Sequence, residues 1–372
     1  MRNKAKMSQQ KTTAKKNQHY VPRFHLKRFS VFGNENEIRM FEKKNEQFIA
    51  STSLKNQASE KYYYGKDGEL EDDLSVSEGI FAETIKSVLS TEKLPAYFSK
   101  EHRTLLHFTV STEFRNPIKK EAMERLTDII GEYAKKHVNF PDEYRNSDSK
   151  LKLKDPVSFT LSNHNQSVLM ISDLHLKLLK NITAIPFITS DNPVVHYNQF
   201  LEQHTKLQAI TGYGMMGIQI FVPLSPAYML MLYDSQVYYI GKRKSKTVVL
   251  SDPSEIDQLN LIQFMNAKKI CFGNENTSED LFRKLLVRSK SLPIPRQPIF
   301  KRIKTGEQTF TEYHAESSCR TNLRLSFVAY STFASRVKFE DNALFYPRAF
   351  ALQMADAIRN DPHFRDFQDT ST

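Results

Sequence analysis

With 372 residues, 40% of them hydrophobic and 11% aromatic, the chain is long enough for a main core and a smaller addition. Its formal net charge of +11 favours polyanionic partners, and its two cysteines exclude a disulfide framework or a cysteine-built zinc site. No apolar run approaches the roughly 20 residues of a membrane span, so we expect a cytoplasmic protein that binds nucleic acid and no membrane.

The first part of the chain changes from a polar tail to extended segments and then to a helix. Residues 1–17 are polar and basic, which predicts a disordered tail. Residues 38–49 predict a β-hairpin, because two apolar runs flank a Lys43-Lys44-Asn45 turn. Apolar residues at helical spacing then predict a helix over residues 70–89.

Two further helices and a loop are predicted next. Ser99 is a suitable N-cap for a helix that runs through Thr112. Pro117 breaks or kinks the pattern, and helical spacing continues over residues 121–138. Residues 139–157 are polar and contain prolines, which predicts a loop.

The second half of the chain alternates predicted helices and strands. The predicted helices cover residues 166–179, 253–267 and 278–288, and the predicted strands cover 183–189, 217–222, 228–233 and 269–272. These elements predict an α+β fold that is predominantly helical, with a small antiparallel sheet.

Proline content sets the predicted domain boundary. Residues 292–298 contain three prolines and predict a linker. We therefore expect a main domain over residues 18–291 and a C-terminal extension over 299–372.

The densest group of chemically versatile side chains follows the basic tail. The segment His19–Phe29 holds two histidines, three fixed cations and three aromatic residues. Together with Glu69–Glu78, Phe114–Pro117 and Ile188–Pro193, this segment resembles the bacterial domain of unknown function 4238 family over roughly residues 18–275. The family has no settled activity, so the resemblance implies relatives and candidate residues. We expect the aromatic residues of the segment to be buried against the helix that carries Glu78.

His19 and Arg23 are the candidates from this segment. The pKa of a histidine lies near neutrality and Pro22 restricts the backbone, so His19 is a candidate base or metal ligand. The alternative is a histidine that is hydrogen-bonded within a packed arm. Arg23 is expected to orient a phosphate or to bridge acidic groups.

Glu78 and Arg115 both fall on apolar helix faces. The spacing of Glu78 from Leu74 and Phe81 places its carboxylate on the buried side, where it needs a cation, a metal or a proton. Arg115 ends an apolar face just before Pro117, which suits a phosphate clamp. The alternative for both is a structural salt bridge between them.

Asp191 lies where a predicted strand ends at Ser190-Asp191-Asn192-Pro193. Carboxylates at strand ends often bind metals or act in catalysis, whereas Asp-Asn-Pro is also a strong turn former. Both interpretations stay open.

Two functions fit these residues. The first is a metal-dependent nuclease, of the phage-defence or toxin type, that hydrolyses RNA or DNA. In it, His19, Glu78 and Asp191 would bind Mg²⁺ or Mn²⁺, while Arg23 and Arg115 hold the phosphate. The second is a non-catalytic module that binds nucleic acid or protein, in which the same residues form a buried structural network.

Overall fold

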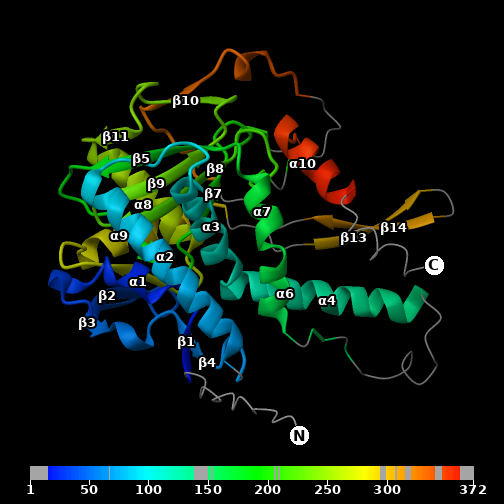
Figure 1. The fold of residues 1–372 in the computed structure, drawn as a ribbon, viewed down its shortest axis with the longest axis horizontal. Coiled ribbons are helices and arrows are strands. Elements are labelled where there is room, and N and C mark those ends of the chain that lie inside the picture. The colour runs from blue at the N-terminus through cyan, green and yellow to red at the C-terminus, as the bar shows by residue number, and fades with distance from the viewer. Residues whose placement is uncertain are drawn as a thin grey trace, which may run out of the picture.

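The structure is a computed structural model whose regular elements alternate along the chain (Figure 1). It describes residues 16–66, 68–137, 150, 152–153, 155–204, 207, 210–293, 299–305, 308–314, 320–339 and 346–360. The helices are α1 (Arg23–Lys27), α2 (Glu69–Thr91), α3 (Lys100–Phe114), α4 (Pro117–His137), α6 (Pro156–Ser162), α7 (His164–Met170), α8 (Pro253–Asn266), α9 (Glu279–Lys290) and α10 (Ala349–Asn360). The strands are β1 (Asn17–His19), β2 (Glu37–Glu42), β3 (Gln47–Ser53), β4 (Ser59–Lys61), β5 (His175–Asn181), β6 (Thr189–Ser190), β7 (Val195–Tyr197), β8 (Gln219–Ser225), β9 (Tyr228–Tyr233), β10 (Tyr238–Ile240), β11 (Thr247–Leu250), β12 (Ile270–Gly273), β13 (Ile299–Thr305), β14 (Gln308–His314) and β15 (Val328–Tyr330).

A five-stranded sheet forms the centre of the molecule, with the strand order β11-β5-β9-β8-β7. Strand β11 runs parallel to β5, and the other neighbours are antiparallel. Successive side chains of a strand point to opposite faces, and in β5, β8 and β9 both faces are buried. This explains why residues 219–233 are almost continuously apolar.

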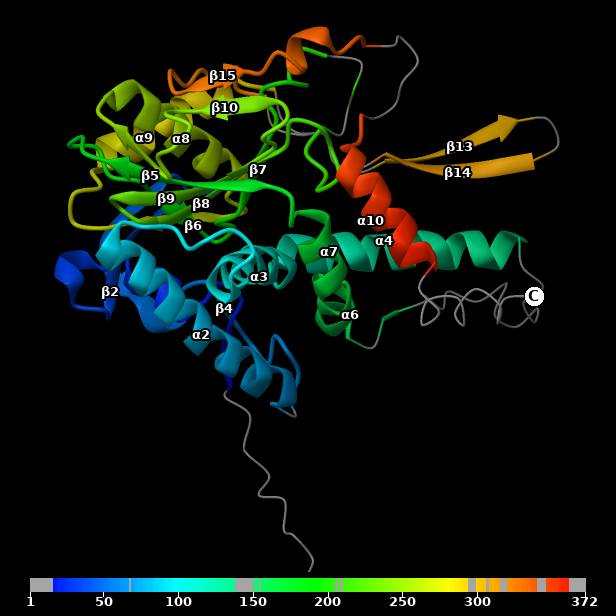
Figure 2. The same cartoon turned by 45° about the horizontal axis from the view of Figure 1, so that its top comes forward.

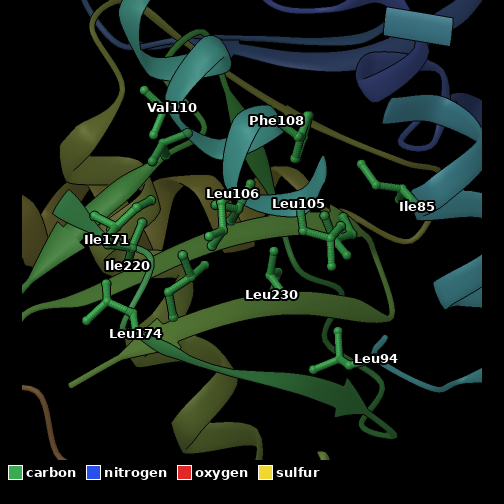
Figure 3. Close-up of a cluster of buried hydrophobic side chains, with 14 of the residues drawn as sticks. Ile85, Leu94, Leu105, Leu106, Phe108, Val110, Ile171, Leu174, Ile220 and Leu230 are labelled. Atoms are coloured by element: carbon green, nitrogen blue, oxygen red, sulfur yellow. The ribbon is translucent and has the colours of Figure 1, made fainter. Parts of the chain in front are cut away.

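Helices cover both faces of this central sheet. On one face, side chains of α2 and α3 pack on Ile220 and Leu230, and Figure 3 shows Leu105 and Leu106 of α3 over these strands. On the other face, α8 packs on Phe221 and its neighbours. The result is a helix–sheet–helix arrangement, which Figure 2 shows from the side.

A second sheet has the strand order β3-β2-β12-β6. One of its faces packs on α8 and α9 through Phe41 and Cys271, and the other packs on α1 and its surroundings through Ile38 and Phe272. Burial raises the pKa of the Cys271 thiol, so this cysteine is an apolar core group.

The predicted fold class is wrong. The sheets are not small, one strand pair is parallel, and the fold is mixed α/β. One cause is the predicted helix over 166–179: only its first part is helical, and β5 begins at His175. In addition, the predicted strand over 183–189 contributes only at its end, as β6.

Several predicted elements are confirmed. Strands β2 and β3 form the expected hairpin, and α2 covers the predicted range. The Ser99 hydroxyl accepts a hydrogen bond from the backbone N–H of His102 and caps α3, as its sequence position predicts. Pro117 separates α3 from α4. Strands β8, β9 and β12 and helices α8 and α9 also occur where they were expected.

The region after the predicted linker contributes to the main core. Leu323 and Leu325 are buried beside the central sheet, and β15 pairs with β10. Farther along, Arg348 forms a salt bridge with Asp173. Most of residues 1–17 and 292–298, and Cys319, lie outside the described residues. No helix in the described ranges is long and apolar enough to span a membrane.

Candidate functional site

The short pairing of β1 with β4 determines which side chains face a cavity. His19 lies opposite Ser59, and Asn17 lies opposite Lys61. Between them, Gln18 is fully buried, and its amide bonds with the backbone of Tyr64 and Gly65. Because side chains alternate along a strand, the inward position of Gln18 directs Asn17 and His19 to the other side.

The aromatic side chains after β1 fix this strand to the helical layer. Phe29 is fully buried, Tyr20 is 9% exposed, and Phe24 is partly buried against Phe108 in the core. The predicted burial of the N-terminal arm is therefore confirmed. The packing of these aromatic side chains holds His19 in place beside α2.

An open cavity of about 1030 Å³ lies between β1, β4 and α2. We refer to it as the His19 cavity. It is lined by the cations Lys16, Arg23, Lys55 and Lys61, by the acids Glu60, Glu71 and Glu78, and by His19, Asn17, Asn56, Ser59 and Ser75. Its size is at the upper end of the range for small-molecule sites, so a nucleotide fits.

His19 is the histidine that lines this cavity. Its Nε2 atom is buried and has no hydrogen-bond partner among the described residues. Burial lowers the pKa of His19, and Arg23 lowers it further, while the negative charge of Glu78 and a hydrogen bond with the backbone of Leu54 oppose them. The lowered pKa favours the neutral ring at pH 7.

Arg115 and Glu78 form an ion pair at the inner side of the cavity. The Arg115 Nη1 atom lies 2.8 Å from Glu78 Oε1, and the side chains are 1% and 26% exposed. Arg115 also donates from Nε to the backbone carbonyl of Tyr20, at 3.1 Å. This is the structural pairing that the sequence offered as the alternative to a phosphate clamp.

Asp191 does not line the His19 cavity. Its Oδ1 atom accepts from the backbone N–H of Lys268 at 2.8 Å, and Oδ2 accepts from Lys269 and Ile270 at 2.7 and 3.1 Å. The residue is 2% exposed, and Asn116 donates to its carbonyl. Burial raises the pKa of Asp191, and the three backbone donors act in the opposite direction. Both carboxylate oxygens are thus used in fixing the start of β12.

The predicted metal ligands therefore separate into two groups. His19 and Glu78 share a cavity, whereas Asp191 directs its oxygens at backbone donors elsewhere. Among the described side chains, no group of three or more His, Cys, Asp and Glu is arranged to hold a metal ion. The three predicted ligands do not fit one ion, although Glu78 remains at the cavity.

A second buried charge cluster surrounds Glu113 at the end of α3. Its carboxylate accepts from Tyr213 and pairs with Lys119 at 2.6 Å and with His196 Nε2 at 2.9 Å. The approach of His196 is an ion contact without hydrogen-bond alignment, while its Nδ1 lies 2.9 Å from the carbonyl of Thr211. Burial alone would raise the pKa of Glu113, but His196 and Lys119 lower it well below its ordinary value. We interpret this cluster as structural.

A smaller cavity of about 350 Å³ lies near the start of α8. Its acidic groups already have partners: Asp252 caps α8, and Glu255 accepts from the backbone of Ser326. This cavity lies apart from the four segments that carry the resemblance, and we assign no role to it.

Sequence reasoning did not identify Lys55 and Lys61 as residues of the site. They come from a short segment whose apolar pattern is weak, and only the pairing of β1 with β4 brings them to His19. Their signal in the sequence was the surplus of cations over acids in residues 55–66.

The fold and the cavity define a mixed α/β protein with a polar pocket that contains a histidine, four cations and three acids. The family described as "Protein of unknown function (DUF4238)" matches residues 17–277, and the chain belongs to that family. The match includes β1, α2, the α3–α4 junction and β6, so the four resembling segments all lie inside it. No curated protein and no solved structure matches the chain.

Proposed function

We propose that the chain is a nuclease whose reaction centre is the His19 cavity. The observation that carries this proposal is the position of His19, which lines an open cavity together with four cations and three acids. Its Nε2 atom is buried and has no hydrogen-bond partner among the described residues, so the proposal requires the ring to turn toward the cavity when substrate binds. Cleavage of a phosphodiester uses a base and cations. The base takes a proton from the attacking oxygen, and the cations offset the charge on the phosphorus-bound oxygens.

In the proposed reaction, His19 accepts a proton from the attacking oxygen, which is that of water or of a ribose 2′-hydroxyl. The new oxygen–phosphorus bond forms as the bond to the leaving oxygen breaks. The proton returns from the histidine or from solvent to that leaving oxygen. Arg23, Lys55 and Lys61 hold the phosphate and neutralise its developing charge.

The residues proposed to bind a divalent ion differ from the ligands that the sequence predicted. Mg²⁺ in phosphoryl-transfer sites is commonly bound by one or two carboxylates together with substrate oxygens. Glu60, Glu71 and Glu78 line the cavity and supply such carboxylates, whereas Asp191 does not line it. We therefore propose that Mg²⁺ or Mn²⁺, if the reaction uses either, binds through one or two of these glutamates together with substrate oxygens.

The alternative is a non-catalytic module that binds nucleic acid in the same cavity. The specific observation in its favour is the buried Arg115–Glu78 pair, which commits one candidate acid to a structural contact. The basic net charge supports polyanion binding under either alternative.

Incubation of the purified chain with labelled RNA and DNA, with EDTA, Mg²⁺ or Mn²⁺, distinguishes the two functions. A nuclease gives products that disappear in His19→Gln. Because burial and Arg23 lower the pKa of His19, kcat/KM should rise with pH and level off below the ordinary histidine pKa of 6.5. Binding without cleavage under all of these conditions supports the module and refutes the nuclease.

A further inference from the structure

Two exposed aromatic side chains lie in the loop between α2 and α3. Tyr97 is 38% exposed and Phe98 is 62% exposed, and their ring centroids are 4.1 Å apart. Tyr97 also contacts the ring of His175 at 5.3 Å. It also packs on His102 and donates its hydroxyl to the carbonyl of Ser172, so Tyr97 supports the more exposed Phe98 ring, which presents an apolar face to solvent.

The backbone of Phe98 holds its ring at the surface. Phe98 has a φ of 62°, in the left-handed region that bulky residues rarely adopt. Its carbonyl accepts from Arg103 Nη1 at 2.9 Å, and the next residue, Ser99, caps α3. The hydrogen bond from Arg103 and the Ser99 cap therefore fix the backbone conformation of Phe98.

A basic loop is hydrogen-bonded to the loop that carries these rings. Residues 242–246 read Lys-Arg-Lys-Ser-Lys and connect β10 to β11, and the four cations of this loop are exposed. Lys246 Nζ donates to the carbonyl of Pro95 at 2.5 Å, and Thr247 donates from its hydroxyl to the carbonyl of Glu92 at 3.1 Å. These two bonds join the basic loop to the aromatic loop, which Figure 1 shows running along the sheet near β5.

The charge around the rings is strongly positive. Lys100 and Arg103 at the start of α3 are exposed and add to the cations of the basic loop. Of the nearby acids, Glu92 is paired with Lys180 and Asp173 is paired with Arg348, which leaves Glu101 as an exposed acid of this region. Cations therefore exceed acids on this surface.

We propose that Tyr97, Phe98 and the basic loop form a binding surface for single-stranded nucleic acid. Bases would stack on the exposed rings, and the cations of the loop and of α3 would contact the phosphates. A duplex hides the faces of its bases, so the rings favour a single strand.

This surface is separate from the His19 cavity. Glu78 lines the cavity, and Thr91 ends the same helix near the aromatic loop. Thirteen helical residues at about 1.5 Å each separate the two positions by about 20 Å along α2. The proposal goes beyond the nuclease function and does not depend on it.

The test measures binding of a fluorescein-labelled oligo(dT) and of an oligo(U) RNA by anisotropy, over a series of salt concentrations. The full chain carries His19→Gln so that cleavage does not affect the titration. We expect Phe98→Ala to raise Kd at least about fivefold, because one stacked base contributes about 1–3 kcal/mol. Phe98→Tyr keeps the ring and should retain the affinity.

Phe32→Ala is the matched control, because Phe32 is 79% exposed and has a φ of 51°, and its backbone N–H donates to Glu275 rather than to the aromatic or basic loop. It should leave Kd unchanged. Replacing Lys242, Arg243 and Lys244 with Gln should reduce the slope of log K against log salt by about 0.7 for each lost phosphate contact.

The proposal would be overturned by an unchanged Kd in Phe98→Ala with normal unfolding, or by equal losses in Phe98→Ala and Phe32→Ala. Binding to phosphatidylserine vesicles without binding to either oligonucleotide would also overturn it. Preferential binding of duplex DNA over both single strands would also contradict it.

Discussion

The polar network that runs from His19 to Asp191 has an open end at the His19 cavity and a sealed end in the core, and the two ends differ in what their charged atoms contact. At the open end, His19 and Glu78 line a cavity with four cations. At the sealed end, both carboxylate oxygens of Asp191 accept backbone hydrogen bonds. Arg115 and Asn116 connect the ends through Tyr20 and Asp191. The comparison shows that a charged residue near a site contributes to chemistry only if its polar atoms are not already committed to the fold.

The largest expected change in stability is at the sealed end. Asp191→Asn replaces an oxygen that accepts backbone N–H groups with an amide that presents its own N–H groups to them. We expect the free energy of unfolding to fall by about 3 kcal/mol, measured by denaturant titration. The control Asp252→Asn, at the exposed cap of α8, should lose about 1 kcal/mol or less. A fully stable Asp191→Asn protein would show that these bonds do not hold the turn.

Substitution of Glu113 should give the next largest loss of unfolding free energy, and this loss should depend on pH. Glu113→Gln should cost about 2 kcal/mol at pH 7, because it leaves Lys119 without its counter-charge and disturbs the contacts of Glu113 with His196 and Tyr213. The pKa of Glu113 is depressed in the folded state, so its stabilisation is present above the ordinary value of 4.5 and is lost as pH falls below it. Denaturant titrations at pH 7 and pH 4 should show a smaller difference between the two proteins at pH 4. A difference that grows at pH 4 would contradict this assignment.

Arg115 lies between the two ends and should have a smaller effect. Arg115→Lys keeps a charge near Glu78 but loses the Nε donor to Tyr20. We expect a loss of about 1 kcal/mol in unfolding free energy with little change in affinity for a labelled oligonucleotide. If affinity falls severalfold while stability stays at the wild-type level, Arg115 is a phosphate clamp after all.

Local patterns predicted much of the fold. The stripe of α2, the Ser99 cap of α3 and the break at Pro117 follow from spacing and residue type alone. Local patterns did not predict the size of the central sheet, because β5 combines apolar and charged residues in a run that also fits a helix face. Its pairing with β9 and β11 depends on residues more than 40 positions away, which no local window contains.

The same limit applies to the candidate site. The sequence placed Glu78 and Arg115 on buried helix faces, and the structure pairs them. It could not decide whether Asp191 faces a cavity or the backbone, since this depends on the start of β12 packing against the turn. Lys55 and Lys61 join the cavity only through strand pairing.

The central claim is that the open end carries a reaction, and His19→Gln tests it most directly. Unfolding and cleavage of labelled RNA and DNA are measured for the wild type, His19→Gln and a control, His164→Gln, which alters a partly buried histidine of α7 outside the His19 cavity. We predict that His19→Gln changes the unfolding free energy by no more than about 0.5 kcal/mol and slows cleavage at least about 100-fold, while His164→Gln cleaves at the wild-type rate. A folded His19→Gln protein that cleaves as fast as the wild type would contradict the account.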